Sequence, residues 1–458
     1  MTTRWNKIGV LLTALALVGA GCAGPSEAQQ VATRPVTLKV WQVFENQAAF
    51  EDLMNTYRAI HPNVSFEYSQ KRADEYEEEL LHAFARGEGP DIFTIHNTWI
   101  GEYVPLIEPL PPSLNIAYAE TRGSIKKETV YLLKQEPTLS FRALKNDFVD
   151  AVAKDVVRSY RPNANANPQD RIFGLPLSVD TLALYFNRDL LNAGGIAEPP
   201  ASWSAFQDQV TKLTRIGQNS QVLQSGAALG TGKNVERATD ILNLLMLQNG
   251  VTLVDDRGVA TFAANVDKKE GLAADALRFY TDFANPLKQV YTWNEAQPNS
   301  FDAFVSGKTA FFFGYSYHAA LIKARSPKLN FAIASAPQIE GGKVVNYANY
   351  WVQTVARQTK NRDWAWDFVQ FATGKEPVGG YLEATRSPSA RRSLIAGQLE
   401  DEILSVFSSQ TLTSTSWYRG RDAKAAEKAF EDLIDAALSG ADVERELVTA
   451  QNKINQTL

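Results

Sequence analysis

Hydrophobic residues alternate with polar ones over residues 36–40, which predicts a first strand. Apolar residues then recur every three or four positions over residues 50–57, the spacing of a helix with one buried face. The same succession gives a second strand over 64–68, a second helix over 76–84 and a third strand over 92–95. Strands that alternate with helices predict an α/β fold in which a parallel sheet is covered by helices.

Polar and aromatic residues follow two of these strands directly. Phe44 and Glu45 come after the first strand, and Asn97, Thr98 and Trp99 come after the third. Ligands of such sheets bind beyond the carboxyl ends of the strands. We therefore expect these residues to line one half of a cleft for a polar ligand.

A second strand-forming region begins near the middle of the chain. Residues 182–186 form a short apolar run between Pro176 and Gly194, which favours a buried strand. Asp180 precedes the run, at the mouth of the strand. Because 458 residues suggest about two or three domains, this strand is a candidate crossing from one unit into another.

The C-terminal half continues with apolar strands and helices. Residues 309–313 predict a strand that leads into Tyr315 and Tyr317, and residues 347–355 predict another that carries Tyr350. Residues 110–172 have a less readable pattern. Further elements are expected at 241–247, 272–283, 331–334, 364–371, 426–437 and 443–454.

Composition excludes several classes of function. The formal charge of −5 argues against a nucleic-acid partner, which requires a clustered basic surface. The single cysteine, Cys22, allows neither an intramolecular disulfide nor a cysteine metal site. The chain has four His and no HExxH motif, which argues against a catalytic zinc site. We expect no metal and no cofactor.

The N-terminus has the layout of a secretory signal peptide over residues 1–21. Arg4 and Lys7 precede an apolar run over 8–18, which is shorter than the ~20 residues of a membrane-spanning helix. The small residues before Cys22 resemble a bacterial lipobox, which implies lipidation of Cys22, although Gly19 stands where Leu is usual. Residues 22–35 then read as a tether to the anchor. Cleavage after Ala28, which would release a free protein, is the alternative.

Five segments together resemble the family 1 extracellular solute-binding proteins, the family of maltose-binding proteins. They are HPNVSFEY (61–68), GEGPDIF (87–93), LALYFNRDLL (182–191), GKTAFFFGYSY (307–317) and the ending SWYRG…FEDLIDAALSG (416–440). The resemblance implies a two-lobe Venus-flytrap fold, with a mostly parallel sheet in each lobe and several hinge crossings. Lobe 1 would comprise 36–180 plus about 331–375, and lobe 2 would comprise 181–330 plus about 376–458.

The resemblance also implies roles for particular residues. Asp180 matches an acid that contacts ligand hydroxyls, residues 97–99 match a first-lobe binding loop, and Tyr315, Tyr317 and Trp417 match aromatic platforms for a sugar face. Tyr315 and Tyr350 could equally pack inside. The chain departs from the family at Ile95, where Trp is usual, and in the longer 110–172 segment. The predicted ligand-binding residues are Phe44, Glu45, Asn97, Thr98, Trp99, Asp180, Tyr315, Tyr317, Tyr350 and Trp417.

The resemblance implies a substrate-binding component of an ABC importer rather than an enzyme. It would capture a mono- or oligosaccharide and deliver it to a membrane permease. It would act as a monomeric lipoprotein in the periplasm or on the outer face of the cell membrane, held there through its lipid anchor only. A polyamine, ion or peptide ligand is an alternative within the same fold. A glycoside hydrolase that uses Glu45 and Asp180 is an alternative of another class.

Overall fold

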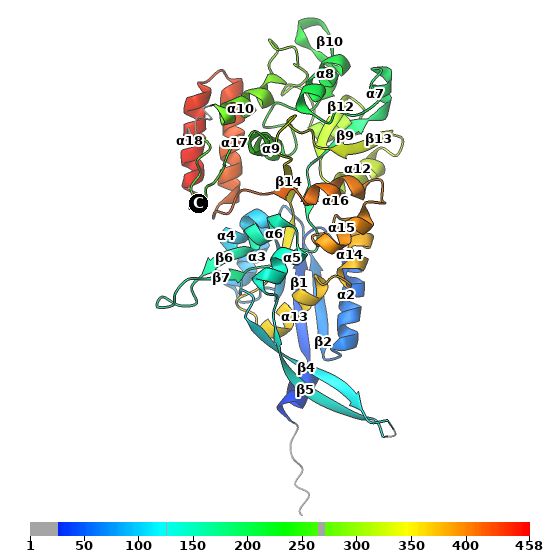
Figure 1. Ribbon diagram of the computed structural model, residues 1–458, viewed down its shortest axis with the longest axis vertical. Helices are drawn as coiled ribbons and strands as arrows, with labels where there is room; N and C mark the ends of the chain where they lie inside the picture. Colours follow the sequence, from blue (N-terminus) through cyan, green and yellow to red (C-terminus); the bar gives the residue numbers. More distant parts are fainter. Residues whose placement is uncertain (1–25, 125, 264–270) are drawn as a thin grey trace, which may run out of the picture.

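The computed structural model describes residues 26–124, 126–263 and 271–458. The predicted signal peptide and Cys22 therefore lie outside the described residues. The chain forms two α/β lobes stacked along the long axis of the molecule (Figure 1), which confirms the predicted two-lobe fold. Within the described ranges, no helix is both long and apolar enough to cross a membrane.

The first lobe contains a four-stranded sheet of order β15-β3-β1-β2. Strand β1 is parallel to both β2 and β3, because helices α2 and α3 return the chain to the same edge each time. Only β15 is antiparallel. The strands are β1 (Val36–Gln42), β2 (Val64–Gln70), β3 (Ile92–His96) and β15 (Trp351–Val355).

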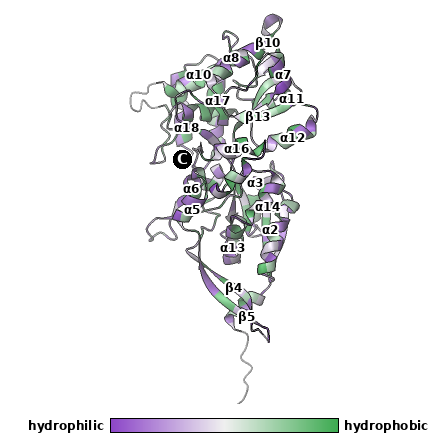
Figure 2. Cartoon of the chain, turned by 45° about the vertical axis from the view of Figure 1, so that its right-hand side comes forward, coloured by the Kyte–Doolittle hydropathy of each residue, from purple (hydrophilic) through white to green (hydrophobic). Residues whose placement is uncertain are grey.

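Helices cover both faces of this sheet, as the sequence pattern predicts. In α2 the buried residues are Phe50, Leu53, Met54 and Tyr57, spaced three and four apart. In Figure 2 the hydrophobic residues gather on the sides of elements that face into the lobes. The helices are α2 (Gln47–Ile60), α3 (Tyr76–Ala85), η1 (Asn97–Trp99), α4 (Ile100–Tyr103), α5 (Phe141–Asp147), α6 (Asp150–Val156), α13 (Arg362–Ala372), α14 (Val378–Thr385) and α15 (Arg392–Gln398).

The segment with the less readable sequence pattern, residues 110–172, forms helices α5 and α6 and two hairpins. Strands β4 (Ser113–Arg122) and β5 (Glu128–Pro137) pair along ten positions, and β6 (Val157–Tyr160) pairs with β7 (Gln169–Ile172). Helix α1 (Glu27–Thr33) packs against β4 and β5. The expected tether over 22–35 is therefore wrong for these residues: Ser26 caps the helix and Val31 packs against the first core.

The second lobe contains a five-stranded sheet of order β10-β11-β12-β9-β13. Only β11 and β12 are parallel neighbours, so the expected mostly parallel sheet is wrong in this lobe. Strand β9 leads away from the junction, whereas β12 and β13 return toward it, so both run antiparallel to β9. The strands are β9 (Ala183–Asn187), β10 (Arg215–Ile216), β11 (Val222–Ala227), β12 (Thr309–Gly314) and β13 (Phe331–Ser335).

Two hydrophobic clusters cover the two faces of this second sheet. The larger cluster includes the buried face of α9, where nearly every residue is buried. The helices of the lobe are α7 (Arg188–Ala193), α8 (Trp203–Leu213), η2 (Gln218–Ser220), α9 (Ala238–Gln248), α10 (Leu272–Asp282), α11 (Ser300–Val305), α12 (Tyr317–Arg325), α17 (Ala423–Leu438) and α18 (Val443–Asn455).

A small sheet of order β16-β14-β8 joins the lobes. Asp180 pairs with Asn349, and Asn346 pairs with Ser414, so crossing segments far apart in the sequence support one another. Helix α16 packs against this sheet and against β13. The elements are β8 (Asp180–Thr181), β14 (Asn346–Asn349), β16 (Ser414–Thr415) and α16 (Leu404–Thr411).

The return crossings lie later in the chain than predicted. Strand β13 extends the second sheet beside β9, so the return near residue 331 is wrong. The chain rejoins the first core only at Ala348. Tyr381 and Ile395 also belong to the first core, because α14 packs on α2 and the Tyr381 ring meets that of Phe50 at 5.2 Å. Residues 376–395 are thus not part of lobe 2.

The burial pattern predicts where truncation destabilises the second lobe. Leu184 in β9 is fully buried, and Leu184→Ala should lower the free energy of unfolding by about 2–5 kcal/mol. Leu223 in β11 of the same sheet is 60% exposed, and Leu223→Ala should change it by less than about 0.5 kcal/mol. Urea unfolding followed by circular dichroism measures both. Equal effects would contradict the described packing of this sheet.

Candidate functional site

Two adjoining chambers lie between the lobes. The larger, of about 510 Å³, is bordered by Phe44, Tyr317 and Trp351, and we call it the aromatic chamber. The smaller, of about 220 Å³, is bordered by charged side chains, and we call it the polar chamber. His96, Arg237, Asn349 and Trp351 border both chambers, so the two are continuous.

Aromatic rings reach the aromatic chamber from both lobes. Phe44 lies just after β1 of the first lobe and is 57% exposed, and its ring meets that of Trp351 edge-on at 5.2 Å. Tyr317 begins α12 of the second lobe, is 51% exposed and stacks on His318 at 4.1 Å. Large apolar side chains exposed together in a concave site offer contact surface to a ligand.

Hydrogen-bonding groups lie among these rings. The Gln353 amide donates to Gln42 Oε1 at 3.2 Å, and both side chains border the aromatic chamber. Glu45 accepts a hydrogen bond from the Tyr381 hydroxyl at 3.0 Å, and burial raises the pKa of Glu45 above its ordinary value. Amides and carboxylates beside apolar rings suit a ligand that has both hydroxyl edges and apolar faces.

Asp180 lies at the hinge with both carboxylate oxygens engaged. Oδ2 accepts from the Ser316 amide at 2.9 Å and the Ser316 hydroxyl at 2.6 Å, and Oδ1 accepts from the Thr181 amide at 2.8 Å. Burial raises the pKa of Asp180 to about 7, although these three bonds oppose the rise. Asp180 therefore fixes the start of α12, next to Tyr317, as well as bordering the aromatic chamber.

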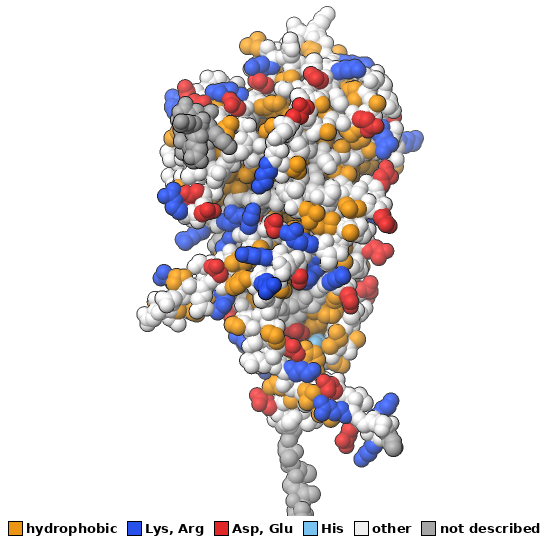
Figure 3. Space-filling model, viewed as in Figure 1, with side chains coloured by type: hydrophobic (Ala, Val, Ile, Leu, Met, Phe, Trp, Pro, Cys, Tyr) orange, Lys and Arg blue, Asp and Glu red, His pale blue; other side chains and the backbone are white. Residues whose placement is uncertain are grey.

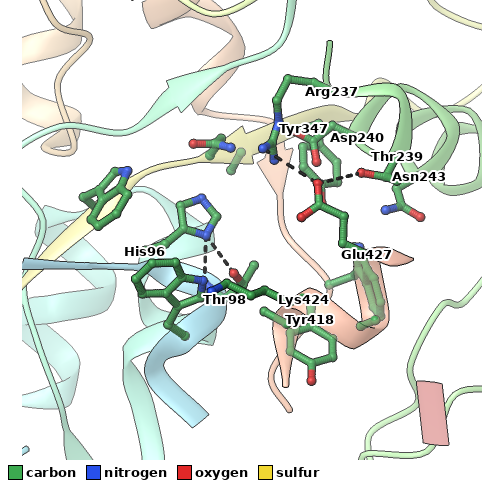
Figure 4. Close-up of a pocket in the computed structure, with 17 residues that line it drawn as sticks. His96, Thr98, Arg237, Thr239, Asp240, Asn243, Tyr347, Tyr418, Lys424 and Glu427 are labelled. Atoms are coloured by element: carbon green, nitrogen blue, oxygen red, sulfur yellow. Dashed lines mark hydrogen bonds and ion pairs between the residues drawn. The ribbon is translucent and has the colours of Figure 1, made fainter. Parts of the chain in front are cut away.

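Charged side chains of the second lobe line one side of the polar chamber (Figure 4). Arg237 Nε donates to Asp240 Oδ2 at 2.7 Å, and its Nη1 lies 3.8 Å from Glu427 Oε1. Burial opposes the Arg237 charge, but Asp240 and Glu427 raise the pKa of Arg237 well above its ordinary value. Burial also raises the pKa of Glu427. Arg237, whose backbone has φ 58°, borders both chambers.

His96 and Thr98 face these groups from the first lobe (Figure 4). His96 Nδ1 lies 2.7 Å from Thr98 Oγ1 and accepts from the Thr98 amide at 3.4 Å, which indicates a neutral ring with its proton on Nε2. Burial, together with the Arg237 charge, lowers the pKa of His96 to about 4. The ring therefore stays neutral at physiological pH.

The structure brings most of the predicted residues to the two chambers. Three border the polar chamber: Thr98, Trp99 and Trp417. Five border the aromatic chamber: Phe44, Glu45, Asp180, Tyr317 and Tyr350. Tyr350 is almost wholly buried, and its hydroxyl donates to Asp155 at 2.7 Å, so it presents little surface there.

Two predicted residues border neither chamber. Tyr315 is buried, and its hydroxyl donates to Asp240 at 2.6 Å, whereas Tyr317, at the start of α12, is half exposed. Asn97 is buried, and its amide donates to Asp155 at 3.1 Å. Neither residue therefore presents surface to the chambers, although Tyr315 still holds Asp240 in place.

Sequence reasoning missed several cavity residues. His96 ends β3, at one of the two strand ends that the sequence predicts to line the cleft, and it borders both chambers, although it is not among the predicted ligand-binding residues. Trp351 looked like an internal strand residue, yet it borders both chambers. Arg237 and Glu427 carried no local signal, because only the tertiary fold brings a loop and α17 together. Within the part of the chain that the structure describes, no cluster of His, Cys, Asp and Glu is arranged to hold a metal ion.

Comparisons with known proteins agree with this architecture. The family described as bacterial extracellular solute-binding protein matches residues 52–402. A Brucella abortus protein described as a binding protein is 21% identical to this chain over 334 residues. The match covers 71% of this chain and 69% of that protein.

Two solved structures share the fold. The sugar-binding protein MalE of Xanthomonas citri is 16% identical, with a TM-score of 0.69 over 92% of this chain and 97% of that one. An ABC transporter solute-binding protein of Thermotoga lettingae, bound to α-D-tagatose, is 17% identical, with a TM-score of 0.64 over 92% of this chain and 99% of that one.

The Asp180 contacts predict a structural effect of its removal. Asp180→Ala leaves the Ser316 and Thr181 amides without their acceptor, so the free energy of unfolding without ligand should fall by about 1–3 kcal/mol. Asp208→Ala, at an exposed site in α8, is the control and should leave it unchanged. Urea unfolding tests this. Unaltered stability of Asp180→Ala would show that the carboxylate does not hold α12.

The neutral state of His96 predicts a pH dependence. Because its folded pKa of about 4 lies below the ordinary 6.5, the fold favours the neutral ring, and this stability is lost as pH falls from 6.5 toward 4. His96→Gln should therefore lose less melting temperature over that range than the unmodified protein. His82→Gln, at an exposed site in α3, should follow the unmodified profile. Identical profiles for all three proteins would contradict the assignment.

Proposed function

This chain belongs to the bacterial extracellular solute-binding proteins, and from that membership we propose that its solute is a carbohydrate, captured between the lobes for an ABC importer. The observation that carries the proposal is the pair of exposed rings, Phe44 and Tyr317, which border one chamber from opposite lobes. A sugar ring has apolar C–H faces that pack on aromatic rings and hydroxyl edges that need polar partners. Gln353, Asn349 and Glu45 supply such partners.

The proteins that share the fold support a carbohydrate ligand. The Xanthomonas protein is a sugar-binding protein, and the Thermotoga protein was solved with tagatose. Both are less than 20% identical to this chain, so their own ligands do not identify the sugar that this chain binds. That sugar is set by the residues of the two chambers.

Binding in this account favours closure of the lobes. A ligand that touches Phe44 and Tyr317 together gains the second contact only when the lobes approach each other, so it shifts the hinge equilibrium toward the closed state. Ion pairs already join the two lobes across the junction. Lys424 of α17 pairs with Glu77 of α3, and Arg419 Nη2 lies 3.3 Å from Asp155 of the first lobe. The closed pair of lobes is the form that a permease would recognise.

The remaining assignments extend this proposal. Cys22 carries the lipid anchor, which holds a monomeric, exported chain in the periplasm or on the outer face of the cell membrane. The proposed role is binding without catalysis. Although burial raises the pKa of both Glu45 and Asp180, each carboxylate accepts hydrogen bonds from the chain itself, and Asp180 has both oxygens engaged.

The charges of the chambers favour a sugar over a polyamine. A polyamine needs several free carboxylates, yet Asp180 is bonded to Ser316 and Asp240 is paired with Arg237. Arg237 and Lys424 also place two cations beside the polar chamber. A neutral, hydroxyl-rich ligand meets both signs of charge without an excess of either.

A melting-temperature screen tests the ligand class. Mono- and oligosaccharides, spermidine and short peptides are added in excess to the purified protein, and a sugar should raise the transition by mass action. The same sugar is then incubated with the protein and analysed by chromatography. Stabilisation by spermidine or a peptide but by no sugar would overturn the carbohydrate assignment, and turnover of the sugar would overturn the binding role.

The exposed rings predict which substitutions weaken binding. Phe44→Ala and Tyr317→Ala should each weaken the Kd for the stabilising sugar about tenfold to a hundredfold, because each removes ring surface from the chamber. Phe141→Ala, 40% exposed at the start of α5 and away from both chambers, is the matched control. Calorimetric titration measures all three. Unchanged affinity in both chamber variants would place the sugar elsewhere.

A further inference from the structure

The β4–β5 hairpin projects from the first lobe as a separate ribbon (Figure 1). Its two strands form a sheet of their own, so the outer half depends only on pairing between the strands. Gly123 has φ 95°, and a Cβ there would lie 2.1 Å from the Lys126 carbonyl oxygen, so the tight turn requires glycine. The projection lies at the far end of the molecule from β10 and the second lobe.

The start of the described chain lies beside this hairpin. Helix α1 packs against both β4 and β5, and Ser26 caps its first turn. Ser26 follows Cys22 by only four positions, which span at most about 14 Å of extended chain. A lipid carried by Cys22 therefore brings this end of the first lobe, and with it the hairpin, close to the bilayer.

The end of the hairpin carries exposed cations. Arg122, Lys126 and Lys127 flank its turn, and all are exposed. Glu120 pairs with Arg122 and with Lys134, both at 3.2 Å. Among the described residues, Lys126 and Lys127 have no carboxylate partner within ion-pair distance. In Figure 3, Lys and Arg side chains, with acids among them, gather along this projection at the lower right.

We propose that the end of the β4–β5 hairpin is a membrane-contact surface that binds anionic lipid headgroups through Lys126, Lys127 and Arg122. The proposal rests on the proposed anchor at Cys22, which supplies the proximity. The whole chain has a formal charge of −5, so its net charge opposes attraction to a negative membrane, and a local group of cations is what would attract one. Anchor and hairpin together hold the first lobe toward the lipid and the interlobe chambers away from it.

The experiment uses the exported, purified full mature chain in vesicles. Its only cysteine is Cys22, which lipidation blocks, so Ser124→Cys gives one reactive thiol at the hairpin turn. A dye on this thiol is read against a quencher in the lipid headgroups. Gln218→Cys, exposed in the second lobe near β10, is the matched control position. Vesicles contain phosphatidylcholine alone or with phosphatidylglycerol.

Quenching at position 124 should be strong on phosphatidylglycerol vesicles, weak on phosphatidylcholine alone, and absent at position 218. Adding Lys126→Gln and Lys127→Gln should reduce membrane association of the tip roughly tenfold, as should high salt. Quenching at position 124 that is the same on both kinds of vesicle, or the same with and without these lysines, would overturn the proposal. The double lysine variant could instead associate with vesicles as the unmodified chain does, yet lose transport. That result would indicate that the lysines contact a protein partner, and it would also overturn the proposal.

Mass spectrometry of the mature chain tests the lipid anchor independently of the hairpin proposal. Acyl groups on Cys22 show the anchor directly. If the chain carries none, the anchoring proposal fails and the Cys22 thiol is free, so the dye is read on the Cys22→Ser, Ser124→Cys chain after it is mixed with preformed vesicles. Absence of quenching on phosphatidylglycerol vesicles in that form would overturn the hairpin proposal as well.

Discussion

The hydrogen bonds that Asp180 accepts at the hinge connect the two features on which binding depends. Its backbone pairs with Asn349 in the sheet that joins the lobes, and its carboxylate holds Ser316 at the start of α12. Tyr317 follows directly, so the position of the exposed ring in the second lobe is set by the strand that crosses between lobes. A change at this carboxylate therefore alters the hinge and the chamber together.

The chambers combine exposed rings with polar groups that are already paired. Phe44 and Tyr317 remain exposed because nothing within either lobe covers them, whereas Asp180, Asp240 and Arg237 are held by neighbouring groups. The paired polar groups hold the site in order before a ligand binds, and burial of the exposed rings supplies free energy on binding. This division explains how one site can be rigid in its polar part and still favour closure around a ligand.

The periodicity of apolar residues in the sequence was sufficient to predict the helices and strands of the first sheet and many of those in the second lobe. The alternation at residues 36–40 and the helical spacing of 50–57 depend on one buried face, which local sequence records directly. The direction of β9 relative to β12 and β13 depends on where the chain enters and leaves the lobe, which local sequence does not record. The same limit applies to residue 331, whose strand continues the second sheet rather than crossing back.

The candidate site shows the same boundary between local and tertiary information. The rule that ligands meet strand ends led to Phe44, Glu45, Thr98 and Trp99, all of which border the chambers. It could not separate Tyr315 from Tyr317, whose rings stack 6.2 Å apart, because only the tertiary packing buries Tyr315 against Asp240. Arg237 and Glu427 come from a loop and from a helix near the C-terminus, and only folding places them together.

A crystal structure of the chain with the sugar that stabilises it would test the central claim most directly. The account predicts a sugar ring packed against both Phe44 and Tyr317, with its hydroxyls bonded to groups of the aromatic chamber and the lobes closed around it. A sugar bound to one lobe alone, or outside the two chambers, would contradict it.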